Sequence, residues 1–117
     1  MNSSFFKLLK TSTLVTLFFS SMLFSDEYFI IDVRSLDEVQ TGILEDAIHI
    51  EWTKISSEID NLNLSKDDEI FLYCRSGNRP GKAQVILQNL GFTNVLNAGG
   101  INEAAKKLEK KIVKYSD

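Results

Sequence analysis

A chain of 117 residues is long enough for one folded domain and too short for two of ordinary size. Its content of 44% hydrophobic and 25% charged residues is that of a globular protein and argues against a disordered chain. All 16 acidic residues lie at or after Asp26, together with 11 of the 13 basic ones, so this part of the chain has a net charge of −5. Such a charge repels a phosphate backbone, and we expect no nucleic-acid partner.

The first 25 residues have the pattern of a secretory signal peptide. Lys7 and Lys10 precede a mostly apolar run at residues 14–24, and no other charge occurs before Asp26. The alternative is an uncleaved N-terminal anchor, but the run is shorter than the about 20 residues that span a bilayer. We therefore predict a signal peptide at residues 1–25 and a periplasmic or otherwise exported domain at residues 26–117, which would meet a membrane only through an uncleaved N-terminal segment.

The first half of the domain predicts two strands and two helices. A strand at residues 28–33 is followed by a helix that starts after Ser35, where Glu38 completes a capping box and Gly42 is expected at the C′ position. A shorter strand is predicted at residues 47–51. The next helix is expected to begin at Thr53 as its N-cap and to bury Ile55, Ile59 and Leu62.

The second half repeats this alternation. A strand at residues 69–73 leads to a helix with Pro80 in its first turn and Gly91 after its end. A strand at residues 94–97 precedes a last helix that begins near Asn102. The residues expected on the buried faces of these helices are Ala83, Ile86, Leu87 and Leu90, then Ala104, Ala105, Leu108, Ile112 and Tyr115.

Strands that alternate with helices indicate an α/β fold with a mostly parallel sheet and helices on both faces. Ligands of such sheets bind at the carboxyl ends of the strands. Cys74, the only cysteine, directly follows the strand at residues 69–73 and precedes the helix that starts at Pro80. The helix N-terminus, Arg75 and Arg79 all favour a thiolate over a thiol there. The alternative is a tight strand-to-helix turn that happens to contain a cysteine.

The segment Cys74-Arg75-Ser76-Gly77-Asn78-Arg79 resembles the active-site loop of single-domain rhodaneses. The resemblance extends to residues 31–35, 41–43 and 47–48, and to residues 91–95 and 99–101. These blocks occur in the order of that family over about 75 residues, which makes the resemblance more specific than the loop alone.

The resemblance implies a five-stranded parallel sheet and a sulfurtransferase. A cysteine of this family takes the sulfane sulfur of thiosulfate and passes it to cyanide or a thiol. Cys74 would then be the nucleophile and persulfide carrier, and the substrate-binding residues would be Arg75, Ser76, Gly77, Asn78 and Arg79. The two arginines would attract the anionic donor, and the backbone of residues 75–79 would hold the outer sulfur.

The chain departs from the family pattern in three places. Glu45 and Asp46 replace a Pro-Gly-like turn, and Asn102 stands near the place of an aromatic residue after the Gly-Gly pair. No strand is predicted before residue 28, which favours a sheet of four strands over one of five.

Four other residues have a structural interpretation. Arg34 is predicted to pair with a nearby carboxylate such as Glu38, and Asp32 to satisfy a turn. His49 and Trp52 are predicted to pack rather than to react. One Cys and one His form no zinc motif, so we expect neither a metal nor a cofactor.

Three other functions remain open. A Cys-dependent phosphatase is disfavoured because the loop is Cys-x4-Arg rather than Cys-x5-Arg. A non-catalytic persulfide relay that serves a partner protein would use the same loop. An inactive scaffold would keep Cys74 buried and unreactive.

Overall fold

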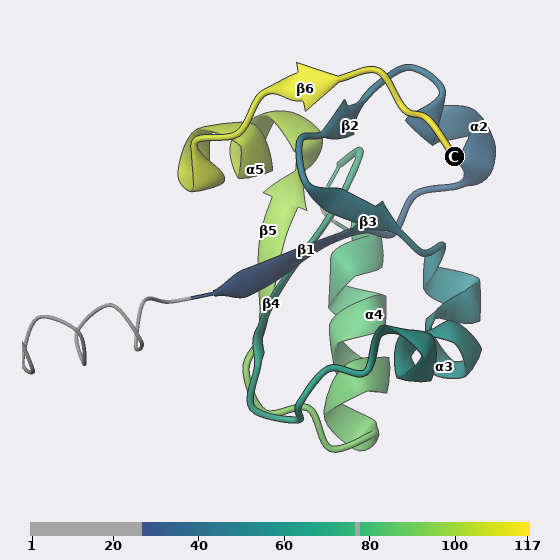
Figure 1. Ribbon diagram of the computed structural model, residues 1–117, viewed down its shortest axis with the longest axis vertical. Coiled ribbons are helices and arrows are strands. Elements are labelled where there is room, and N and C mark those ends of the chain that lie inside the picture. The colour runs from purple at the N-terminus through teal and green to yellow at the C-terminus, as the bar shows by residue number, and fades with distance from the viewer. Residues whose placement is uncertain (1–26, 77) are drawn as a thin grey trace, which may run out of the picture.

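The computed structural model describes residues 27–76 and 78–117 (Figure 1). The predicted signal peptide at residues 1–25 and Gly77 lie outside the described residues. Within the described part of the chain, no helix has both the length and the apolar character needed to cross a bilayer.

The described residues form an α/β domain whose main sheet has four parallel strands in the order β3-β1-β4-β5. The strands are β1 (Tyr28–Asp32), β2 (Ile43–Leu44), β3 (Ala47–His49), β4 (Glu69–Cys74), β5 (Val95–Gly100) and β6 (Ile112–Val113). The helices are α2 (Leu36–Val39), α3 (Ile55–Glu58), α4 (Asn78–Asn89) and α5 (Ile101–Leu108), with the 3-10 helices η1 (Trp52–Lys54) and η2 (Ile59–Leu62) flanking α3. The α/β class and the sheet of four parallel strands agree with the sequence prediction.

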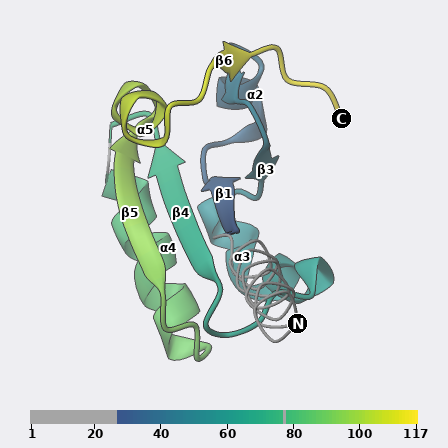
Figure 2. The ribbon, with the colours of Figure 1, turned by 60° about the vertical axis from the view of Figure 1, so that its left-hand side comes forward.

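Helices lie on both faces of the sheet (Figure 2). Successive residues of β1 and β4 point to opposite faces, so each strand contributes to both packing layers. One face packs against α3 and α4 and contributes Ile31, Ile70 and Leu72 to a cluster of buried side chains. The other face, with Ile30 and Tyr73, packs against β2 and α5 in a second cluster. Two apolar layers therefore fix the sheet between its helices.

The helix between β3 and β4 differs from its prediction. Ile55 and Ile59 are buried as expected, but Thr53 lies inside η1 and does not cap a helix. Only four residues of this segment are α-helical, and no side chain caps them. The elements η1, α3 and η2 follow one another without a break and bury Ile55 and Ile59, so the helical segment begins before Thr53.

The last helix is shorter than predicted. It ends at Leu108, because Glu109 adopts a left-handed conformation and the N–H of Lys110 bonds the carbonyl of Ala105 at 3.0 Å. Ile112 consequently lies in β6, which pairs with β2, and its side chain is 47% exposed. The prediction that the helix buries Ile112 and Tyr115 is therefore wrong.

Two smaller predictions also change. Gly42 follows α2 with a φ of +136°, but it lies one residue beyond the predicted C′ position because the C-cap is Gln40. Leu90 follows the end of α4 and is 40% exposed, whereas Ala83 and Leu87 are fully buried as expected. Strand β5 extends beyond residue 97 to Gly100.

Candidate functional site

The segment that carries Cys74 lies at the carboxyl edge of the sheet, where β4 ends and α4 begins (Figure 1). The β4–β5 ladder is regular up to the pair Leu72–Asn97, is then interrupted, and resumes with Cys74 opposite Gly100. The extra residue lies in β5, where three steps from Asn97 to Gly100 match two from Leu72 to Cys74. The predicted position of the thiol, at a strand end and just before a helix, is therefore observed.

The side chain of Cys74 is fully buried and belongs to the cluster between the sheet and α4. Its surroundings are not only apolar, since Cys74 also interacts with the guanidinium of Arg79. The pKa of Arg79 is raised chiefly by its hydrogen bond to Glu38, against the opposing effect of burial, and further by the charge of Cys74 and a hydrogen bond to it. A buried thiol beside a guanidinium differs from one that packs only against aliphatic side chains.

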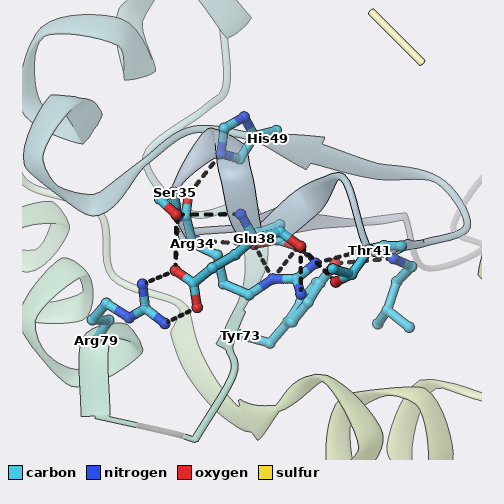
Figure 3. A network of polar contacts seen from close by, with 10 residues as sticks. Arg34, Ser35, Glu38, Thr41, His49, Tyr73 and Arg79 are labelled. Carbon is cyan, nitrogen blue, oxygen red and sulfur yellow. Dashed lines mark hydrogen bonds and ion pairs between the residues drawn. The ribbon is translucent and has the colours of Figure 1, made fainter. Parts of the chain in front are cut away.

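Glu38 and Arg79 form a two-pronged ion pair between α2 and the first turn of α4 (Figure 3). Arg79 Nη2 lies 2.7 Å from Glu38 Oε2, and Nη1 donates to Oε1. This pair, together with the hydrogen bonds from Ser35, lowers the pKa of Glu38 to about 2, although burial acts in the opposite direction. Both side chains are about a quarter exposed, at 26% for Arg79 and 25% for Glu38.

Arg34 pairs with a nearby carboxylate as predicted, but that carboxylate belongs to Asp32 and not to Glu38. Arg34 Nη2 lies 2.6 Å from Asp32 Oδ2, and Nε lies 3.0 Å from both carboxylate oxygens. Arg34 also donates to the carbonyls of Gly42 and Glu38. Asp32 is the partner because it and Arg34 are both buried, and a buried charge needs an opposite charge at close range.

Asp32 satisfies its turn as predicted, since its Oδ1 accepts a hydrogen bond from the Arg34 backbone N–H at 2.9 Å. It also hydrogen-bonds Tyr73, whose hydroxyl accepts a bond from the Leu44 N–H at 2.9 Å. Burial and the neighbouring Asp32 raise the pKa of Tyr73. These contacts tie β1, β2 and β4 together directly beneath the segment that carries Cys74.

A hollow of about 500 Å³ opens at this edge of the sheet. Arg75, whose side chain is exposed, lies on one side of it, and Ile101 and Asn102 from the start of α5 lie on another. Its remaining lining residues are Arg34, Glu38 and Thr41. Ser76 lies between the end of β4 and the start of α4, Asn78 is the first residue of α4, and both are exposed.

His49 and Trp52 make structural contacts, as predicted. The His49 Nε2 lies 2.6 Å from the Arg34 carbonyl, and its ring meets that of Tyr115 edge-on. Trp52 packs against the core, and the Lys82 ammonium lies 5.0 Å from its ring centre. Within residues 27–76 and 78–117, no cluster of three or more His, Cys, Asp or Glu side chains could hold a metal ion.

The sequence prediction missed two residues that contact the ends of this segment. Glu38 was assigned to the helix cap and offered as a partner of Arg34, whereas the residue it pairs with is Arg79. Gly100 lies so close to the backbone of Arg75 that a Cβ would stand 2.6 Å from its carbonyl oxygen. The capping box marked Glu38 in the sequence as a residue with a structural role. The closeness of Gly100 to Arg75 follows only from the sheet register, which places Gly100 opposite Cys74.

Comparisons with known proteins agree with this architecture. The profile of the Rhodanese-like domain matches residues 18–107. The chain is 34% identical over 91 residues to the thiosulfate sulfurtransferase PspE of Escherichia coli, covering 78% of this chain and 86% of that protein. It is 31% identical to the adenylyltransferase and sulfurtransferase UBA4 of Candida albicans over 76% of this chain, but spans only 22% of that protein.

Solved structures give the same result. A structure described as a rhodanese with anions from E. coli superimposes with a TM-score of 0.69 at 31% identity, covering 76% of this chain and all of the other. The parallel sheet, the strand-to-helix segment with Cys74 and these similarities lead to one assignment. The chain belongs to the family of rhodanese-like sulfurtransferases.

Proposed function

We propose that this protein is a thiosulfate sulfurtransferase that carries a sulfane sulfur as a persulfide on Cys74. The observation that carries the proposal is the position of the chain's only cysteine, at the carboxyl end of β4 and in contact with Arg79. The similarity to a thiosulfate sulfurtransferase over most of both chains supports thiosulfate as donor.

The proposed reaction has two half-reactions. The Cys74 thiolate attacks the outer sulfur of thiosulfate, so that a new S–S bond forms while the S–S bond of thiosulfate breaks and sulfite leaves with the electron pair. Cyanide or a thiolate then attacks the outer sulfur of the persulfide. That sulfur leaves as thiocyanate or as a new persulfide, and the Cys74 thiolate is restored. No net oxidation occurs, and neither a metal nor a cofactor is required.

The charged groups at the carboxyl edge of the sheet would assist both steps. Arg75 is exposed beside the hollow, where it would attract an anionic donor. Arg79 would stabilise the sulfur anion, and the backbone N–H groups of residues 75–79, with Ser76, Gly77 and Asn78 between the arginines, would hold the outer sulfur. Because Cys74 has no exposed surface, donor binding requires a small shift of the atoms that cover it.

Mass spectrometry of the thiosulfate-treated protein tests the proposal. We expect an adduct of about 32 Da, the mass of one sulfur atom, which cyanide removes with the release of thiocyanate. Cys74→Ser is the matched control and should neither gain the adduct nor transfer sulfur. Absence of the adduct from the wild-type chain, or its presence on the Ser variant, would refute the assignment.

A persulfide relay to a protein acceptor is a second candidate. The hollow of about 500 Å³ beside Arg75 is larger than a five-atom anion such as thiosulfate requires, which favours it as a place for part of a larger acceptor. A persulfide that forms but turns over with a protein thiol and not with cyanide would identify the relay. Turnover of a phosphate ester at a rate comparable to thiosulfate would instead support a phosphatase.

We also propose that the domain acts after export, with residues 1–25 as its signal peptide. The two lysines and the apolar run that follows them support this proposal. The mass of the chain recovered from the periplasm of a Gram-negative host tests it. A chain that stays in the cytoplasm with its first residues intact would exclude export.

A further inference from the structure

We propose that Glu38 is a positioning residue that holds the Arg79 guanidinium against Cys74 and thereby sets the reactivity of the thiol. The proposal rests on the proposed function of Cys74 and adds to it a residue 36 positions earlier in the chain. Arg79 comes only five residues after Cys74, but a long side chain at a helix start has many rotamers. A second side chain is therefore needed to hold Arg79 in one rotamer.

The geometry of the ion pair provides this selection. Both carboxylate oxygens of Glu38 engage both terminal nitrogens of Arg79, which fixes the plane of the guanidinium (Figure 3). The charge of Cys74 and a hydrogen bond to it also raise the pKa of the Arg79 guanidinium, so Cys74 is within hydrogen-bonding reach of the group that Glu38 holds. Within the described part of the chain, no second carboxylate forms an ion pair with Arg79.

Glu38 is itself held in place by Ser35. Its Oε1 accepts hydrogen bonds from the Ser35 N–H at 3.2 Å and from the Ser35 hydroxyl at 3.0 Å. The Ser35 hydroxyl oxygen in turn accepts the Glu38 N–H at 3.3 Å. The carboxylate thus connects the capped start of α2 to the start of α4, and it stays ionised at any pH at which the protein would work, because its pKa is about 2.

The sign of the effect distinguishes positioning from direct electrostatics. A carboxylate near a thiolate disfavours the thiolate, so removing the charge of Glu38 would by itself make Cys74 more reactive. If Glu38 acts by holding Arg79, its removal lets the guanidinium move to solvent, and the thiolate loses a charge-assisted hydrogen bond. A slower reaction of Cys74 is therefore the signature of positioning.

The test measures the rate at which iodoacetamide, a neutral reagent, alkylates Cys74 in the full chain at one fixed pH. The variants are Glu38→Ala and Glu38→Gln, each made in the wild-type and in an Arg79→Gln background. We expect Glu38→Ala to slow alkylation about tenfold, with a smaller effect for Glu38→Gln, which keeps one acceptor. In the Arg79→Gln background neither change should slow the reaction further.

Asp37→Asn is the matched control, because Asp37 is an exposed acidic residue of the same helical turn. It should leave the alkylation rate unchanged. Unfolding midpoints of all variants show whether each chain is folded, and Glu38→Gln serves if Glu38→Ala is not. An unchanged or faster rate in the Glu38 variants, or equal slowing in both backgrounds, would overturn the proposal.

These outcomes are separate from those of the proposed function. Alkylation requires no sulfur donor, so coupling of Glu38 to Arg79 can be present in a protein that fails to transfer sulfur. A wild-type chain that transfers sulfur but shows no coupling would retain its function and lose only this role of Glu38.

Discussion

Gly100→Ala is the substitution whose effect the geometry defines most sharply. Gly100 ends β5 directly opposite Cys74, with φ of −79° and ψ of 168°, which any residue can adopt. The substitution therefore introduces no backbone strain of its own. The problem is space, because a Cβ at this position would lie 2.6 Å from the carbonyl oxygen of Arg75 and 3.3 Å from its carbonyl carbon.

The required displacement follows from these distances. Ordinary van der Waals contact begins at 3.4 Å, so the Arg75 carbonyl and the new methyl group must separate by about 0.8 Å, the difference between 3.4 and 2.6 Å. The clash is with backbone, which cannot rotate away as a side chain can. Overpacking of this kind costs about 1–3 kcal/mol of stability. A misplacement of about 1 Å in an active site reduces turnover by about 100-fold.

We therefore expect Gly100→Ala to reduce thiosulfate-to-cyanide sulfur transfer by about 10- to 100-fold while the chain remains folded. Gly81→Ala is the matched control, since its nearest neighbour, Asn97 Nδ2, would lie 4.0 Å from the new Cβ. Both variants are assayed for transfer and for urea-induced unfolding. If Gly100→Ala keeps wild-type activity, the backbone after Cys74 is not held by β5, and the reasoning fails.

Three further predictions concern stability. Asp32→Ala leaves the Arg34 guanidinium buried without its carboxylate, and we expect a loss of about 3–5 kcal/mol in urea titrations, whereas a loss below about 1 kcal/mol would contradict the view of a desolvated pair. The folded-state pKa of Glu38 is lowered to about 2, so the stability that its ionised form contributes is present above about pH 4.5 and is lost as the pH falls towards 2. The difference in unfolding free energy between the wild type and Glu38→Gln should therefore shrink over this pH range. A difference that stays constant would contradict this prediction. Gly81→Ala replaces a glycine inside α4 and should raise the unfolding free energy by about 0.5–1 kcal/mol, and an unchanged or lower value in urea titrations would contradict this.

The α/β order was predictable because each strand is a short apolar run followed by a helix with clear boundary residues. Ser35 caps α2 as expected, whereas α4 begins at Asn78, two residues before the predicted start, with Pro80 in its first turn. The position of Cys74 followed from the same local pattern, since a strand that runs into a helix places its last residue at the carboxyl edge.

Contacts between distant segments were not predictable in the same way. The sequence alone offered Arg34 a carboxylate two residues before it and another four residues after it, and only burial decides in favour of Asp32. The end of the last helix was missed because the apolar spacing continues past Glu109. Pairing of Ile112 with Leu44, 68 residues earlier, is what takes that segment out of the helix.

The parallel arrangement of the main sheet also fixes how the domain can be attached to anything else. Strand β1 enters at the amino edge, so its five residues, about 16 Å at 3.3 Å each, separate Tyr28 from the edge that carries Cys74 (Figure 2). A tether, purification tag or fused protein that precedes Glu27 would be joined on the side opposite the thiol. Such a fusion would begin away from the hollow that Arg75 and Ile101 line at the carboxyl edge.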